Sequence, residues 1–232
     1  MGGCAGEVAL HRLREAVNPG SLLRVPYRPT DRTRARAAGV RARILEAAHD
    51  LLAEGGYMAA TVQAVAGRAG VATGTVYRHF PGKEDLLGEV FRRASQREVD
   101  AVAAAAGDRQ RPAGERIAAA VETFVRRALA EPVRAYALLA EPVDPAVEIE
   151  RLIFRRAYAG LFAGALADGV ARGELEPMDV DLVAAALVGA LGEALVGPLA
   201  ARDRGDDALV AHLQSFCLSA IRSPHVRHPQ PA

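Results

Sequence analysis

The chain has no tryptophan and few other aromatic residues, with five tyrosines and six phenylalanines among 232 residues. Alanine, leucine and valine must therefore fill most of its core. No segment alternates β-branched and polar residues as half-buried strands do. Runs such as AVAAAAG and LVAAALVGAL instead favour helices, because alanine and leucine have high helix propensity. The sequence predicts an all-α fold of about nine helices.

Cysteine and catalytic strings are also scarce. Cys4 and Cys217 are too few for a disulfide framework. Cys217 falls on an apolar helical stripe and is interpreted as a small hydrophobic residue, with a redox sensor as the alternative. The strings G-x-S-x-G, H-E-x-x-H and G-x-G-x-x-G are missing, and Gly82-Lys83 is followed by glutamate rather than the serine or threonine of a phosphate-binding loop. We expect no enzymatic activity, no metal and no cofactor.

Residues 1–20 lack the apolar core of a secretory signal. The longest apolar stretch, Leu182–Ala200, has the length of a membrane span. It contains Glu193, Pro198 and many glycines and alanines, so we interpret it as a buried helix at an interface. We expect a soluble, cytoplasmic protein that does not contact a membrane.

Charge is distributed unevenly although the net charge is only +1. Lysine occurs once, at Lys83, whereas residues 1–40 hold seven arginines against Glu7, Glu15 and Asp31. We interpret residues 1–37 as a flexible basic arm that contacts a polyanion. A solvated leader without a partner is the alternative. Residues 223–232 are interpreted as a flexible tail.

Residues 38–84 have the pattern of a helix-turn-helix domain. A first amphipathic helix is expected to begin between Thr33 and Val40 and to end at Gly55-Gly56. Its inward face carries apolar residues at helical spacing. These residues are Ile44, Ala47, Ala48, Leu51 and Leu52.

Two short helices around a turn follow. Thr61 is a suitable N-cap for a helix over Val62–Gly67, and Gly70 suits a left-handed turn. A third helix is expected from about Ala72 to Phe80, before Pro81-Gly82 breaks the chain. A short exposed helix braced by another is what a DNA major groove accepts.

The outer side of the third helix is expected to contact DNA. Hydroxyl and imidazole groups there suit phosphates or base edges; they belong to Thr73, Thr75, Tyr77 and His79. Gly74 lets the backbone approach closely, and Arg78 suits guanine or phosphate. Thr61, at a helix N-terminus, favours a phosphate, and Lys83 is expected to bind the flanking phosphate.

Residues 41–93 resemble the DNA-binding domain of TetR-type (tetracycline-repressor-like) transcriptional regulators. The strings ILEAAHDLLAEGGY, TVQAVAGRAGV and GTVYRHFPGKEDLL carry the resemblance over about a quarter of the chain. It implies DNA contacts at Thr61, Gln63, Thr73, Gly74, Thr75, Tyr77, His79 and Lys83. One departure is Ala72, which stands where a serine often caps the recognition helix. The missing cap costs about 1 kcal/mol.

Further helices are expected after residue 84, because apolar periodicity continues between prolines and glycines. By helix number and pattern, residues 85–222 resemble the ligand-binding and dimerisation domain of the same family. A cavity between its helices is expected to bind a small molecule, with plain core packing as the alternative for each lining residue. The candidate lining is Phe124, Tyr136, Leu139, Phe154, Tyr158 and Phe162. Arg155 or Arg156 is a candidate for meeting an acidic ligand, with a solvated helix face as the alternative.

Two helices are expected to form a dimer interface, two from each subunit. A strip of small residues lets helices approach closely, and an apolar stripe lies on the last helix; an intrachain core is the alternative. The candidate residues are Ala185, Ala186, Gly189, Ala190, Gly197, Val210, Leu213, Phe216 and Cys217.

Together these features predict a homodimeric transcriptional regulator. We expect a repressor that leaves a palindromic operator on double-stranded DNA when an unidentified small-molecule effector binds. One alternative is a helical small-molecule-binding protein or enzyme whose helix-turn-helix-like segment is only structural. Another is a DNA-binding regulator that has no inducer.

Overall fold

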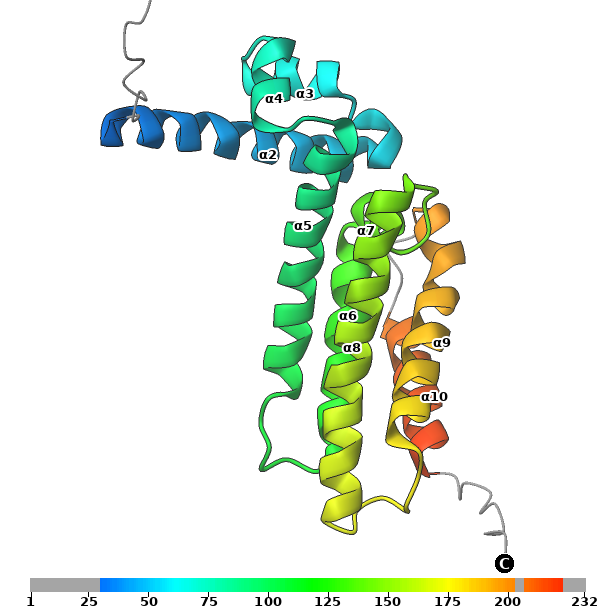
Figure 1. The fold of residues 1–232 in the computed structure, drawn as a ribbon. Coiled ribbons are helices and arrows are strands. Elements are labelled where there is room, and N and C mark those ends of the chain that lie inside the picture. The colour runs from blue at the N-terminus through cyan, green and yellow to red at the C-terminus, as the bar shows by residue number, and fades with distance from the viewer. Residues whose placement is uncertain (1–29, 203–206, 223–232) are drawn as a thin grey trace, which may run out of the picture. The chain divides into compact units, whose positions relative to one another are not determined.

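The computed structural model describes residues 30–202 and 207–222, which form nine α-helices and no strand within those ranges (Figure 1). This confirms the predicted all-α class. By its contacts the chain divides into residues 1–39 and residues 40–232. The expected tail and residues 1–29 of the expected arm lie outside the described residues.

Helix α2 (Asp31–Ala59) begins before the predicted range. Thr30 Oγ1 accepts a hydrogen bond from the Thr33 backbone N–H at 3.3 Å, and the carboxylate of Asp31 lies in the first turn, where negative charge is favourable. Residues 31–37, interpreted above as flexible, are therefore helical. The predicted end of the helix is a kink instead, because Gly56 has φ 74° and a further turn runs to Ala59.

Helices α3 (Val62–Ala69) and α4 (Thr73–His79) form the two short helices of the motif. Thr61 caps α3, since its side chain accepts a hydrogen bond from the Ala64 N–H at 3.1 Å. Gly70 has φ 64° and ψ 41°, the left-handed conformation that turns the chain between the helices. The predicted cap and turn are confirmed.

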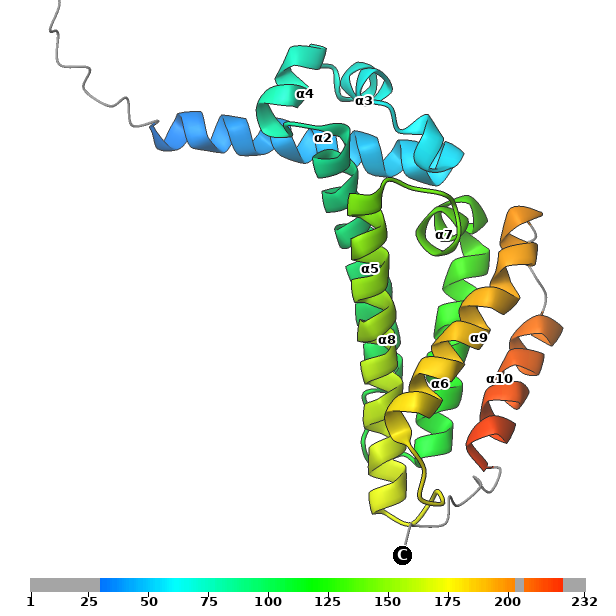
Figure 2. The ribbon, with the colours of Figure 1, turned by 45° about the vertical axis from the view of Figure 1, so that its right-hand side comes forward.

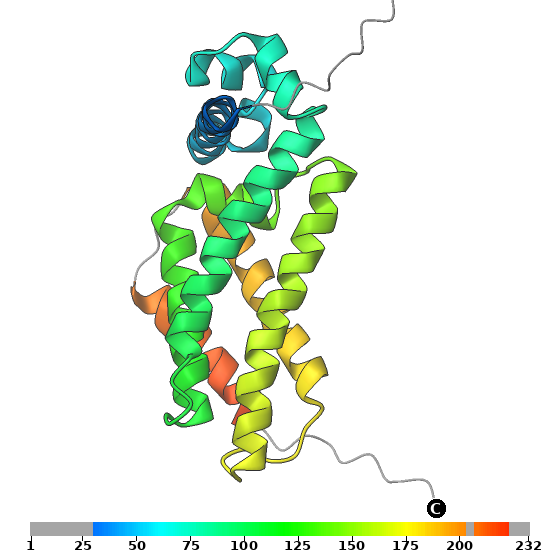
Figure 3. The same ribbon diagram turned by 60° about the vertical axis from the view of Figure 1, so that its left-hand side comes forward.

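Six longer or flanking helices complete the chain: α5 (Lys83–Ala106), α6 (Ala113–Ala130), α7 (Pro132–Leu139), α8 (Pro145–Ala171), α9 (Val180–Ala200) and α10 (Asp207–Arg222). Helix α5 packs along α6 and α8, and Figure 3 shows α5 and α8 side by side. Helix α9 packs on α7 and α8, while α10 packs on α6. Figure 2 shows α9 and α10 as neighbours at the edge of this helical body.

Two hydrophobic cores hold the described residues between 40 and 222. The first joins α2, α3 and α4 to the N-terminal half of α5, and also takes in Leu138 and Val147. The second lies among α5, α6, α8, α9 and α10, around residues such as Val121, Leu166 and Leu191. Because α5 contributes to both cores, it connects the helix-turn-helix to the body.

Helix α9 has the length and apolar composition of a membrane span, with a mean hydropathy of 1.9. Only 28% of its apolar window is buried within the chain. The residues of α9 that are exposed are mostly apolar, among them Leu182, Ala185, Ala186 and Gly189, so one side of this helix is an apolar surface that the described chain leaves uncovered.

Candidate DNA-binding surface and ligand cavity

Helix α4 has one buried and one exposed side. Val76 is 1% exposed and the following Phe80 is 3% exposed, so both anchor the helix in the first core. Thr73, Gly74, Arg78 and Tyr77 are exposed, and Tyr77 retains 51% of its accessible surface. Thr75 and His79 are half-buried, while Thr61 and Gln63 are exposed on the α3 side. Most of the residues predicted to contact DNA are therefore accessible, on α4 itself or at the start of α3.

The N-terminus of α4 is open. Ala72 occupies the N-cap position with φ −69° and makes no side-chain capping hydrogen bond. Apart from Gly74 itself, its two chain neighbours and the backbone of its own helix, no described heavy atom lies within 4 Å of the point where a Cβ on Gly74 would stand. A bulky ligand such as a duplex can therefore approach the backbone at this turn closely.

Lys83 is the first residue of α5, and its ammonium group is held in place by a neighbouring ring. Its Nζ lies 4.3 Å from the centroid of the Tyr57 ring, a cation–π contact. The Gly82 N–H donates to Asp85 Oδ2 at 3.0 Å, which caps the same turn. Lys83 is half-buried rather than freely solvated. Its charge is thereby kept at the junction between α4 and α5.

Tyr57 also joins α2 to the segment between α7 and α8. Its backbone N–H donates to Glu141 Oε2 at 2.8 Å, and its hydroxyl donates to the Asp144 carboxylate. Burial, reinforced by Asp144, raises the pKa of the phenol. A Cβ on Gly56 would lie 2.6 Å from Glu141 Oε2. The Glu141 side chain can shift, but the left-handed φ of 74° at Gly56 itself favours glycine at this junction, which sequence reasoning did not identify.

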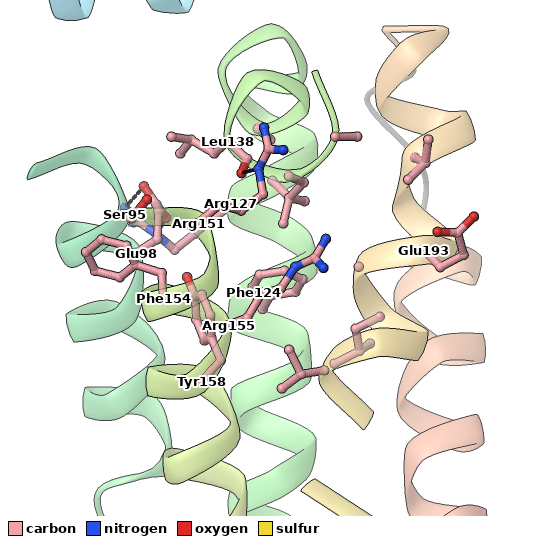
Figure 4. A pocket seen from close by; sticks show the side chains of 18 of the residues that line it. Ser95, Glu98, Phe124, Arg127, Leu138, Arg151, Phe154, Arg155, Tyr158 and Glu193 are labelled. Carbon is pink, nitrogen blue, oxygen red and sulfur yellow. Dashed lines mark hydrogen bonds and ion pairs between the residues drawn. The ribbon is translucent and has the colours of Figure 1, made fainter. Parts of the chain in front are cut away.

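A cavity of about 580 Å³ lies between α5, α6, α7, α8 and α9 (Figure 4). Five of the six candidate lining residues border it, namely Phe124, Leu139, Phe154, Tyr158 and Phe162. The rings of Phe124 and Tyr158 meet edge to face, with centroids 5.3 Å apart.

The sixth candidate, Tyr136, was assigned wrongly. It borders a smaller hollow with Val133 and Leu199. The residues of α7 that border the main cavity are Arg134, Ala135, Leu138 and Leu139. One step along a helix rotates a side chain by about 100°, so Tyr136 points elsewhere.

An ion-pair cluster, absent from the sequence prediction, forms part of the cavity wall. Glu98 on α5 accepts hydrogen bonds from Arg127 at 2.6 Å and from Arg134 at 3.0 Å. All three residues line the cavity. Arg134 also pairs with Glu131 at 2.6 Å, so the two arginines have two carboxylate partners and offer no free charge to a ligand.

Arg151 is 8% exposed and lines the cavity while binding the end of α7. Its guanidinium donates to the carbonyl oxygens of Leu138 at 3.0 Å, Ala137 at 3.2 Å and Glu141 at 2.7 Å. Burial lowers its pKa, although Glu148 opposes this shift. The sequence did contain a signal, because Arg151 stands in the apolar stripe of α8 where a hydrophobic residue was expected.

Four polar groups on the cavity wall lack a partner among the described residues: the hydroxyls of Ser95 and Tyr158, the guanidinium of Arg155 and the carboxylate of Glu193. Arg155 and Glu193 are exposed. Figure 4 shows Glu193 on α9, across the cavity from Ser95 and Glu98 on α5. Of the two candidate arginines, Arg155 lines the cavity and Arg156 does not.

The candidate dimer residues fall into two groups. Ala185, Ala186, Gly189, Gly197 and Phe216 are exposed, whereas Ala190 and Leu213 are half-buried. Gly189 also borders the cavity.

Val210 and Cys217 were assigned wrongly to the dimer face. They are 3% and 0% exposed and belong to the chain's own core, where α10 packs against α6. Burial raises the pKa of the Cys217 thiol to about 11. Both facts favour a packing role over a redox sensor.

Comparison with known families agrees with this geometry. Residues 44–90 match the model described as "Bacterial regulatory proteins, tetR family". Residues 110–194 match the model described as "Tetracyclin repressor-like, C-terminal domain". The two matched ranges together cover more than half of the chain and include both the helix-turn-helix and most of the cavity.

Individual relatives agree with these matches. The chain is 49% identical over 57 residues to the HTH-type transcriptional repressor KstR of Rhodococcus jostii, a match that covers 25% of the chain and 27% of KstR. It is 27% identical over 153 residues to the fatty acid metabolism regulator protein of Bacillus subtilis, covering 65% of the chain and 78% of that protein. The solved structure of Bacillus subtilis FadR in complex with stearoyl-CoA superposes with a TM-score of 0.66 and 24% identity, over 78% of this chain and 97% of that one.

Proposed function

The chain belongs to the TetR family of bacterial regulatory proteins, and we propose on this basis that it is a repressor released from its operator by a small molecule. One observation carries the proposal: an accessible α4 occurs in the same compact unit as a cavity of about 580 Å³. This volume is in the usual range for small-molecule sites, about 300–1,000 Å³. The relatives named above are transcriptional regulators rather than enzymes.

The effector is an amphipathic anion. The cavity wall combines aromatic and aliphatic side chains with four arginines and two glutamates. Arg127, Arg134 and Arg151 have carboxylate partners, so Arg155 is the lining arginine with free charge among the described residues. An apolar body inside the cavity, with a carboxylate or phosphate near Arg155, satisfies both features. The stearoyl-CoA bound to Bacillus subtilis FadR has this chemistry, and a fatty acyl thioester is the proposed class.

The DNA partner is a two-fold-symmetric operator bound by a homodimer. The uncovered apolar face of α9 and the half-exposed Phe216 on α10 support a subunit interface. Each subunit places one α4 in a major groove, with half-sites about one helical turn, or a multiple of it, apart. The predicted contacts stay as given from the sequence, with Lys83 on a flanking phosphate.

A continuous set of contacts supports coupling between the two sites. Arg151 lines the cavity and binds the carbonyls of Leu138 and Glu141. Glu141 and Asp144 bind Tyr57, whose ring lies beneath Lys83. A ligand that shifts Arg151 thereby moves the segment that holds the end of α2, and this changes the spacing of the two DNA-reading helices.

The test uses the full-length protein and stearoyl-CoA. Duplexes are selected from a random library, and the best binder serves as operator in fluorescence anisotropy with and without stearoyl-CoA. We expect the ligand to lower operator affinity at least several-fold. Arg155→Gln should weaken the ligand effect, whereas Glu193→Gln should strengthen it by removing a repelling charge. Arg156→Gln is the matched control, because it lies beside Arg155 but outside the cavity.

Unchanged operator affinity at saturating stearoyl-CoA, with palmitate and other amphipathic anions equally without effect, would contradict the proposed effector class. That result favours the regulator without an inducer. Failure to select any duplex would contradict the repressor itself and favour the structural helix-turn-helix-like segment.

A further inference from the structure

The inner wall of the cavity carries hydroxyl groups that a purely apolar ligand leaves unpaired. Ser95 is 5% exposed and borders the cavity from α5. Its hydroxyl makes no hydrogen bond to any other described residue. Among the described residues, His49 Nε2 is the fully buried side-chain polar atom without a partner, so the Ser95 hydroxyl is still reached by solvent through the cavity. Such a group can exchange its water for an oxygen atom of a ligand.

Tyr158 contributes a second such hydroxyl from α8. Its ring packs on Phe124, and its hydroxyl has no hydrogen-bond partner among the residues that the structure describes. Burial, followed by the charge of Glu98, raises the pKa of this phenol, which therefore stays protonated and able to donate.

Ser95 and Tyr158 border the same part of the cavity. Ser95 and Glu98 are three residues apart on α5 and so share one face of that helix. Glu98 in turn lies close enough to Tyr158 to act on its ionisation. Figure 4 places Ser95 and Glu98 on the wall opposite Glu193.

The carboxylate next to the two hydroxyls already has hydrogen-bond donors, so it does not need the hydroxyls as partners. Glu98 is engaged by Arg127 and Arg134. The two hydroxyls are therefore available to donate to, or accept from, an oxygen atom on a bound molecule.

We propose that the effector carries an oxygen function, a hydroxyl or a carbonyl, on its apolar body, which hydrogen-bonds to Ser95 and Tyr158. This rests on the proposed function, and it narrows the effector class from any amphipathic acyl anion to an oxygenated one. The anionic group lies near the exposed Arg155, and the second oxygen lies inside the cavity. A plain alkyl chain fills the cavity but leaves both hydroxyls without a hydrogen-bond partner. The free-energy cost of these unpaired groups lets the site discriminate against ligands that lack the oxygen.

The test measures affinity for stearic acid and for stearic acids with a hydroxyl at carbon 2, 10, 12 or 18. Calorimetry with full-length protein gives each dissociation constant. One or more of the internally hydroxylated acids should bind roughly tenfold more tightly than stearic acid, as expected for about two added hydrogen bonds. The preferred position reports the distance from Arg155 to the hydroxyl pair.

Two variants and a matched control assign the preference to residues. Ser95→Ala and Tyr158→Phe should each reduce the ratio of the affinity for the hydroxylated acid to the affinity for stearic acid. Tyr136→Phe removes the same group from a tyrosine outside the cavity, and it should keep the full preference.

The outcomes separate this inference from the proposed function. Binding of stearic acid with no preference for any hydroxylated acid, or a preference that survives both variants, overturns the inference and leaves the amphipathic effector intact. If neither the acids nor stearoyl-CoA binds to protein that still binds its operator, the effector class and the inference are both overturned. If stearoyl-CoA binds but none of the acids does, the inference alone is overturned.

Discussion

At the scale of single residues, the two helices proposed to face DNA differ in how they begin. Thr61 caps α3 with a hydrogen bond to the Ala64 N–H, whereas Ala72 leaves the start of α4 uncapped. Ala72 already has the extended backbone that an N-cap requires, with ψ 146°. A hydroxyl at this position needs no rearrangement to reach the first turn.

We therefore predict that Ala72→Ser increases the free energy of unfolding by about 1 kcal/mol and that Thr61→Ala decreases it by about the same amount. Urea denaturation followed by circular dichroism measures both changes. A serine variant no more stable than the parent would mean that the start of α4 is strained or covered in a way that the backbone angles do not suggest.

Lys83 gives a prediction about salt dependence. Its ammonium is positioned over the Tyr57 ring at the start of α5, where the proposed flanking phosphate lies. Lys83→Ala should weaken binding to every duplex and reduce the slope of log K against log salt by about one.

Arg97→Ala is a suitable control for this change. Arg97 is an exposed cation on the same helix, roughly 21 Å further along α5 at 1.5 Å per residue. It should leave the slope unaltered. An unchanged slope for Lys83→Ala, or an equal change for both variants, would place the phosphate contacts elsewhere.

Residues whose role is local were predictable from the sequence. The cap at Thr61 and the left-handed turn at Gly70 depend on a few neighbouring residues and were identified correctly. Ser95 and Arg151 were missed, because their surroundings come from helices far apart in sequence. A polar residue in an apolar stripe is a recognisable signal, but its partner and its cavity depend on tertiary packing.

At the scale of elements, the segment between α7 and α8 connects the cavity to the helix-turn-helix. Tyr57 is 4% exposed, and its hydroxyl donates to Asp144 just before α8. This hydrogen bond joins α2 to the segment that Arg151 also binds. Its loss should therefore reduce the effect of ligand on operator affinity more than it reduces the affinity for either the ligand or the operator.

Tyr57→Phe is therefore predicted to bind both the operator and stearoyl-CoA. Stearoyl-CoA should lower the operator affinity of this variant less than it lowers that of the wild type, so the ratio of the affinities without and with ligand lies closer to one. Anisotropy titrations at several ligand concentrations give this ratio. If the ratio stays at the wild-type value while the variant remains folded, coupling runs through another element, such as α5.

Helix boundaries illustrate the limits of element prediction. The stop at Gly55-Gly56 was expected from glycine alone, yet the chain resumes a helical turn to Ala59 after the kink. Tertiary contacts explain the difference, because Glu141 binds the Tyr57 N–H just beyond the glycine. Likewise, the apolar stripe of α10 was identified, but Val210 and Cys217 face α6, and periodicity alone does not say which neighbour covers a stripe.

At the scale of the whole molecule, the exposed apolar surfaces of α9 and α10 form the proposed dimer interface. Gly189 is a poor site for testing it, since it also borders the cavity. Phe216 is better suited, because it is 52% exposed and lies outside the cavity. An exposed phenylalanine on a helix next to the uncovered α9 is expected to be buried when two subunits meet.

Phe216→Glu should shift the protein from dimer to monomer without unfolding it. Burying the phenylalanine stabilises an interface by about 1.5–3 kcal/mol, and two-fold symmetry applies the loss, together with a buried charge, twice. Operator affinity should fall as well, because the two DNA-reading helices are no longer held at the spacing of the half-sites.

Leu152→Glu is the matched control, since Leu152 is 44% exposed on α8, outside the proposed interface. Sedimentation velocity at several concentrations separates the outcomes: a Phe216→Glu protein that remains a tight dimer would place the interface on another face, and monomers in both variants would extend it to α8.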